Sequence, residues 1–145
     1  VVDERPNGKE SLTIPKGKGR ILYVDDEEAI AALGHDLLTS LGYDVAVCLG
    51  GRDALEAFRA NPKQYDLGIT DMTMPHVTGA TLAREILKIR PETPIILTTG
   101  FSEMINEEES KKIGIREYLM KPVSFKDLAR CVKKLLDQEE TSMEV

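Results

Sequence analysis

Short apolar runs alternate along the chain with longer segments in which apolar residues recur every three or four positions. Each run has only four or five residues, which is typical of strands that are buried on both faces of a parallel sheet. The pattern therefore predicts five strands, at residues 21–24, 44–48, 67–70, 95–99 and 117–120.

The segments between the runs predict helices. In the first segment, leucine and isoleucine side chains follow helical spacing, and Gly42 stands where a left-handed helix cap favours glycine. Pro62 and Pro91 end the second and third segments, and a Ser-x-x-Asp capping pattern opens the last one at Ser124. The predicted helices span residues 27–41, 52–60, 80–89, 102–112 and 125–137.

Strands and helices that alternate through short connections predict right-handed crossovers between parallel strands. The expected fold class is therefore α/β, a doubly wound five-stranded parallel sheet with five helices on its two faces. A chain of 145 residues fits one such domain. We assign residues 20–137 to the domain, 1–19 to a polar linker or tail with two prolines and three glycines, and 138–145 to a polar C-terminal tail.

Composition narrows the function classes. The formal net charge is −6, which argues against direct nucleic-acid binding, because such surfaces are usually basic. The sequence contains neither an apolar run of about 20 residues nor a secretory leader, so we expect no membrane insertion and a cytoplasmic location. Cys48 and Cys131 lie far apart without a metal-binding pattern and are interpreted as ordinary thiols. Because the chain begins at Val1, we expect it to be a piece of a longer protein.

Polar residues follow the predicted strands at their carboxyl ends, where open parallel sheets collect their functional groups. Three carboxylates, two hydroxyls and one ammonium should converge there, from Asp25, Asp26, Asp71, Thr98, Thr99 and Lys121. Three close carboxylates repel one another and call for a hard cation such as Mg²⁺ or Mn²⁺. A lysine and a hydroxyl suit the outer oxygens of a phosphoryl group, and Asp71 would be the nucleophile that receives it.

Four sequence blocks, "ILYVDDEE", "DLGITDMTMPHVTG", "PIILTTG" and "YLMKP", resemble the signature blocks of the receiver domain of two-component response regulators. The resemblance covers residues 20 to 137, and the blocks stand in the expected order. It implies a flavodoxin-like receiver fold with strand order 2-1-3-4-5. It also implies Mg²⁺-dependent phosphoryl transfer from a phosphohistidine and a conformational switch.

The resemblance assigns roles to the residues of the predicted site. It implies that Asp71 is the phosphoacceptor, that Asp26 binds the metal directly and that Asp25 binds it through water. The backbone carbonyl of Thr73 would complete the metal site, and Lys121 would contact the phosphoryl group.

The resemblance also assigns residues to the conformational switch and to the lifetime of the phosphorylated state. Thr99 resembles the switch hydroxyl, and Tyr118 stands at the aromatic switch position. The peptide bond between Lys121 and Pro122 is expected to be cis, as it usually is in this family. Thr73 and Phe101, each two residues beyond a site residue, are expected to tune attack by water and hence self-dephosphorylation.

The context of the domain admits several readings. The polar segment before residue 20 and the polar end after the last helix resemble a C-terminal receiver behind a sensor histidine kinase core. In a hybrid kinase of this kind the parent protein would be an enzyme that could be tethered to a membrane sensor, and a histidine phosphotransfer protein could be the next acceptor. The alternatives are a stand-alone or output-linked response regulator.

The resemblance also implies a possible homodimer through the fourth helix, fifth strand and fifth helix. A phosphatase with an aspartate nucleophile is disfavoured, because Thr73 stands where that class needs a second acid.

Overall fold

Five parallel strands form a single sheet in the order β2-β1-β3-β4-β5. The structure is a computed structural model that describes residues 17–100 and 107–144. A helix lies between every two consecutive strands along the chain, and the strand order reverses at β1. The strands are β1 (Arg20–Val24), β2 (Asp44–Cys48), β3 (Leu67–Asp71), β4 (Ile95–Thr99) and β5 (Glu117–Met120).

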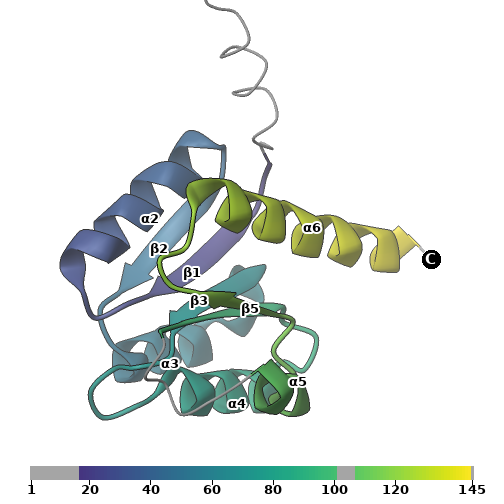
Figure 1. The fold of residues 1–145 in the computed structure, drawn as a ribbon. Helices are drawn as coiled ribbons and strands as arrows, with labels where there is room; N and C mark the ends of the chain where they lie inside the picture. The colour runs from purple at the N-terminus through teal and green to yellow at the C-terminus, as the bar shows by residue number, and fades with distance from the viewer. Residues whose placement is uncertain (1–16, 101–106, 145) are drawn as a thin grey trace, which may run out of the picture.

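The helices form two layers, one on each face of the sheet. Helices α2 and α6 cover one face, and α3, α4 and α5 cover the other (Figure 1). A short 3-10 helix, η1, follows α3 directly. The bounds are α2 (Glu28–Ser40), α3 (Gly51–Ala60), η1 (Pro62–Gln64), α4 (Gly79–Ile89), α5 (Glu107–Ile113) and α6 (Phe125–Glu144).

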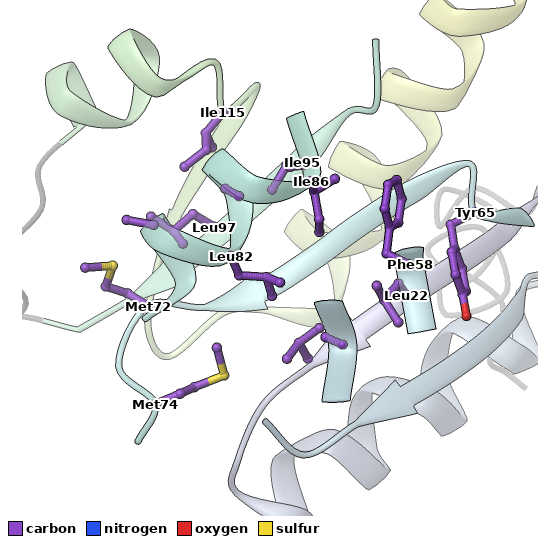
Figure 2. Packing of buried hydrophobic residues seen from close by; sticks show 14 residues of the cluster. Leu22, Phe58, Tyr65, Met72, Met74, Leu82, Ile86, Ile95, Leu97 and Ile115 are labelled. Carbon is purple, nitrogen blue, oxygen red and sulfur yellow. The ribbon is translucent and has the colours of Figure 1, made fainter. Parts of the chain in front are cut away.

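Alternate residues of each central strand supply the two halves of the core. Ile21 and Tyr23 of β1 pack beneath α2 and α6, whereas Leu22 and Val24 pack on the opposite face. Figure 2 shows the cluster on the face covered by α3, α4 and α5, in which Phe58 of α3 lies beside Tyr65. The centroids of these two rings are 5.9 Å apart. Since β3 and β4 are buried along their whole length, the core continues across the middle of the sheet.

The strand and helix pattern predicted from the sequence is confirmed, with differences at element ends. The strand order and the α/β class agree with the expectation. β3 includes Asp71, and α6 continues to Glu144, past the helix end predicted at Asp137, so 138–144 are polar but helical. The start of the helix predicted at 102–112 falls outside the described residues. No helix in the described part of the chain is long and apolar enough to cross a membrane.

The start of α4 lies directly against the end of β3. The Gly79 amide donates to the carbonyl of Met72 at 2.8 Å, and the Thr78 hydroxyl caps the helix by accepting from the Thr81 amide at 3.2 Å. A Cβ atom on Gly79 would lie 2.2 Å from the carbonyl oxygen of Asp71. Because that neighbour is backbone, a side chain at this position would force the helix away from the strand that carries Asp71.

We expect Gly79→Ala to lower the free energy of unfolding by about 3 kcal/mol, because overpacking against backbone cannot be relieved by a rotamer change. Gly50→Ala is the matched control, since a Cβ built there meets nothing within 4 Å. That control should cost no more than about 1 kcal/mol as a change of helix-capping residue. Urea denaturation of both variants checks this expectation, and equal losses would contradict it.

Candidate functional site

Three aspartates meet at the carboxyl ends of β1 and β3. Asp25 follows β1 directly and Asp71 is the last residue of β3, and their exposed fractions are only 2% and 4%. Asp26 is exposed beside them. One carboxylate oxygen from each of the three lies within 4.8 Å of the others. The convergence predicted from strand ends is therefore present, with two of the three carboxylates removed from water.

Lys121 brings the balancing charge from the far edge of the sheet. Its Nζ lies 3.0 Å from Oδ1 of Asp71 and 3.6 Å from Oδ2 of Asp25. The residue follows β5, its amide donates to the carbonyl of Thr99 at 2.7 Å, and its peptide bond to Pro122 is cis. The lysine thus joins the ends of three strands in one cluster of charges.

The Asp25 side chain is oriented by the turn into α2. Its Oδ1 accepts from the amide of Glu27 at 2.9 Å, and its own amide donates to the carbonyl of Cys48 at 3.2 Å. The second carboxylate oxygen is left to face Lys121. One local hydrogen bond therefore decides which side of the Asp25 carboxylate is presented to the site.

Burial and charge shift the pKa values of the cluster. Burial raises the pKa of Asp25, and the negative charge of Asp26 adds to this, although the Glu27 amide and Lys121 act in the opposite direction. Burial lowers the pKa of Lys121, but its hydrogen bond to Asp71 and the charges of Asp25 and Asp71 outweigh that effect and raise it. With a single ammonium among three carboxylates, the site keeps a negative charge that favours a cation.

The donor set fits a small, hard divalent ion. Opposite ligands of an octahedral Mg²⁺ ion are about 4.2 Å apart, since each Mg–O bond is about 2.1 Å. The carboxylate oxygens of the three aspartates lie within 4.8 Å of one another, a comparable separation that small side-chain rotations can adjust. Exposed Asp26 also leaves one side of the cluster open to the waters that Mg²⁺ usually retains.

The predicted hydroxyls lie along the same edge of the sheet. Thr98 pairs with Asp71 in the register of β3 and β4 and accepts from the Met72 amide through its carbonyl at 2.8 Å. The Thr99 side chain is fully buried at the end of β4. Thr73 is exposed in the loop after β3, two residues beyond Asp71. The strand-end arrangement therefore holds for both threonines of β4.

Tyr118, the predicted aromatic switch residue, lies on the edge strand of the sheet. Tyr118 of β5 is half-buried and packs against the core on the side of α3, α4 and α5. It also lines an open cavity of about 340 Å³ together with Ser110 and Ile115. Phe101 lies outside the described residues.

Sequence reasoning missed two backbone features that shape the site. The Glu27 amide holds Asp25, and the absence of a side chain at Gly79 lets α4 touch the carbonyl of Asp71. The signal for the first is the acidic residue placed two positions before a helix cap, where an aspartate readily accepts a backbone hydrogen bond. The second feature, the contact at Gly79, had only a weak signal in the sequence, a Thr-Gly pair at the start of a helical pattern. How closely a helix approaches a strand cannot be predicted from the sequence of either element by itself.

A family model for the response regulator receiver domain matches residues 21–133. Among curated proteins, the transcriptional regulatory protein ZraR of Salmonella typhimurium is 36% identical over 83% of this chain and 27% of its own length. The sensor kinase CckA of Brucella abortus is 34% identical over 90% of this chain and 14% of its own length. The chain thus spans about a quarter or less of these two relatives.

Solved structures agree with the sequence comparisons. A response regulator receiver domain protein from Clostridium thermocellum has a TM-score of 0.81 and 33% identity, covering 85% of this chain and 98% of that one. A CheY-like receiver domain protein from Methanospirillum hungatei has a TM-score of 0.79 and 32% identity, covering 87% and 99%. With the match of the family model and the acidic cluster at the strand ends, these likenesses show that the chain belongs to the family of response regulator receiver domains of two-component signalling.

Proposed function

We propose that Asp71 accepts a phosphoryl group from a phosphohistidine in a reaction that requires Mg²⁺ or Mn²⁺. The observation that carries this proposal is the contact between Lys121 and Asp71 inside a cluster of three carboxylates. A buried aspartate beside an ammonium is a nucleophile with a charge partner already in place for the oxygens of the incoming group.

In the proposed step, a carboxylate oxygen of Asp71 attacks the phosphorus atom as the bond from phosphorus to the imidazole nitrogen breaks. The electron pair of that bond stays on the imidazole, which takes up a proton as it leaves. Lys121 then contacts an outer oxygen of the phosphoryl group, whose charge it balances. Thr99, at the neighbouring strand end, is proposed to donate to another oxygen.

Asp26 and Asp71 would hold the cation directly, with Asp25 acting through water and Thr73 through its backbone carbonyl. When bound, the cation supplies neutralisation of the carboxylates and a binding position for phosphoryl oxygens. The Glu27 amide keeps Asp25 turned so that its free oxygen faces the cluster.

Thr99 and Tyr118 are proposed to form the switch that reports phosphorylation. Thr99 is fully buried and Tyr118 borders a cavity, so movement of the threonine toward a phosphoryl group can be followed by a shift of the tyrosine. The proposed output and dimer face includes α5, β5 and α6. Phe101, with Thr73, is proposed to slow attack by water on the acyl phosphate, and faster loss of the phosphoryl group from Phe101→Ala would support this.

The parent protein is proposed to be a hybrid sensor histidine kinase with this domain at its C-terminal end. The likeness to a sensor kinase over 90% of the chain supports this context, although the likeness to a transcriptional regulator keeps an output-linked response regulator as the alternative. In the hybrid, the kinase core would be the phosphoryl donor and a histidine phosphotransfer protein the next acceptor. Sequencing of the complete gene decides between these contexts.

Incubation with acetyl phosphate tests the central step. We expect the wild-type protein to gain the mass of one phosphoryl group in the presence of Mg²⁺ and none after removal of the metal by a chelator. Asp71→Asn should gain none in either condition, because the amide is a poor nucleophile. Intact-mass spectrometry provides the measurement. A gain of mass by Asp71→Asn equal to that of the wild type would rule out Asp71 as the acceptor.

Without a cation, Asp25→Asn should raise the free energy of unfolding at neutral pH. Burial raises the pKa of Asp25 above 3.8 in the folded protein. Asp25 therefore contributes to folding stability at pH values below its pKa in the unfolded chain, and this contribution is lost as the pH rises through its pKa in the folded protein. The uncharged amide of Asp25→Asn avoids this loss. The difference in the free energy of unfolding between variant and wild type should vanish at pH values below the pKa of Asp25 in the unfolded chain.

Urea denaturation at pH 7 and pH 3, with a chelator present, checks the effect of Asp25→Asn. Added Mg²⁺ should stabilise the wild type more than the variant, since a ligand that binds only the folded state shifts unfolding. A variant that is less stable than the wild type at pH 7 would contradict the electrostatic account of Asp25.

Tyr118→Ala should accept a phosphoryl group from acetyl phosphate at the wild-type rate, because the side chain packs against the core and supplies none of the charged groups of the site. Its discrimination among phosphotransfer partners should weaken. Competition between two purified partners measures the discrimination. Loss of phosphorylation itself would show that Tyr118 supports the site and does not transmit a signal.

A further inference from the structure

A close contact between β1 and α2 lies next to the acidic cluster. Tyr23 of β1 is only 7% exposed and points toward α2, on the same side of the strand as Ile21. Its ring occupies the space where Gly34 of α2 has no side chain. A Cβ atom on Gly34 would lie 2.4 Å from Cζ of the tyrosine and 2.7 Å from its hydroxyl oxygen.

The two residues therefore fit each other by size. The ring is rigid and enclosed by the core, so a methyl group on Gly34 could be accommodated only if the ring or the helix moved by about 1 Å, which restores ordinary carbon–carbon separation. Ala31 and Leu38 are the other buried residues on the inner face of α2. The inner face of α2 nearer the site thus carries only the small residues Ala31 and Gly34, so the ring of Tyr23 sets the distance between α2 and β1 there.

Two hydrogen bonds connect the position of α2 to the orientation of the Asp25 side chain. The Ala31 amide donates to the carbonyl of Glu27 at 2.9 Å, and the Glu27 amide donates to Oδ1 of Asp25 at 2.9 Å. A displacement of α2 relative to β1 moves the Glu27 amide, while Asp25 stays attached to the end of β1. The orientation of the carboxylate thus depends on where the helix lies.

We propose that Tyr23, together with Gly34, is a positioning residue that holds α2 at the distance at which the Glu27 amide orients Asp25 for cation binding. The inference rests on the proposed function of the cluster as a cation site. The competing view is that the pair only fills the core, in which case its substitution lowers stability and leaves cation affinity unchanged.

The experiment compares the wild type with Tyr23→Leu, Gly34→Ala and the double variant that combines them. Tyr23→Leu leaves space under the helix, Gly34→Ala pushes the helix outward, and the double variant restores the fit. Calorimetric titration with Mg²⁺ alone should show affinity weakened about tenfold in each single variant, as is common when a residue behind a metal ligand is lost. The double variant should return to within about twofold of the wild type, because coupled neighbours are non-additive.

The amide resonance of Glu27, recorded by NMR without metal, gives a second readout that simple core filling does not move. We expect it to shift in both single variants and to return in the double variant. Gly50→Ala is the control, since it makes the same chemical change where a Cβ meets no neighbour. Should Gly34→Ala fail to fold, the comparison of Tyr23→Leu with the double variant remains decisive.

Wild-type Mg²⁺ affinity and an unchanged Glu27 resonance in the folded single variants would overturn the inference. A folded double variant that is no better than Tyr23→Leu would overturn it as well. If the wild type itself binds no Mg²⁺, the proposed function of the cluster fails, and the Glu27 resonance still shows whether the pair positions the turn.

Discussion

The arrangement of the site depends on holding Asp25 and Asp71 together out of water, with the ammonium of Lys121 close to both carboxylates. Buried like charges are costly unless they are paired. One lysine cannot balance three carboxylates. Burial raises the pKa of Asp25, and the negative charge of Asp26 adds to this. A divalent cation, as proposed for this site, would relieve the repulsion among the carboxylates, and its binding would link the stability of the domain to its chemistry.

The rest of the fold serves to bring these charges to one edge. Parallel strands place β1, β3 and β5 with their carboxyl ends together, although their residues are far apart in sequence. Helices then fix the exact orientation: α4 packs on the carbonyl of Asp71 through Gly79, and the turn into α2 holds Asp25 through the Glu27 amide. Loss of either contact moves a carboxylate without removing it.

The sequence predicts the strands well because each is a short apolar run, and it predicts the charged cluster because strand ends meet at one edge. It predicts helix ends less well. Residues 138–144 carry no apolar period in the sequence, which is the signal on which the prediction relied, and α6 nevertheless continues through them. The contacts at Gly79 and between Tyr23 and Gly34 depend on how closely two elements approach, which no single segment encodes.

The most direct test of the account is a crystal structure of the protein grown with Mg²⁺ and beryllium fluoride, an analogue of a bound phosphoryl group. We expect beryllium bonded to a carboxylate oxygen of Asp71, a metal ion held by Asp26 and Asp71, and Lys121 in contact with fluoride. Beryllium fluoride bound at another residue, or a metal ion away from the three aspartates, would contradict the proposal that this edge of the sheet is the phosphoacceptor site.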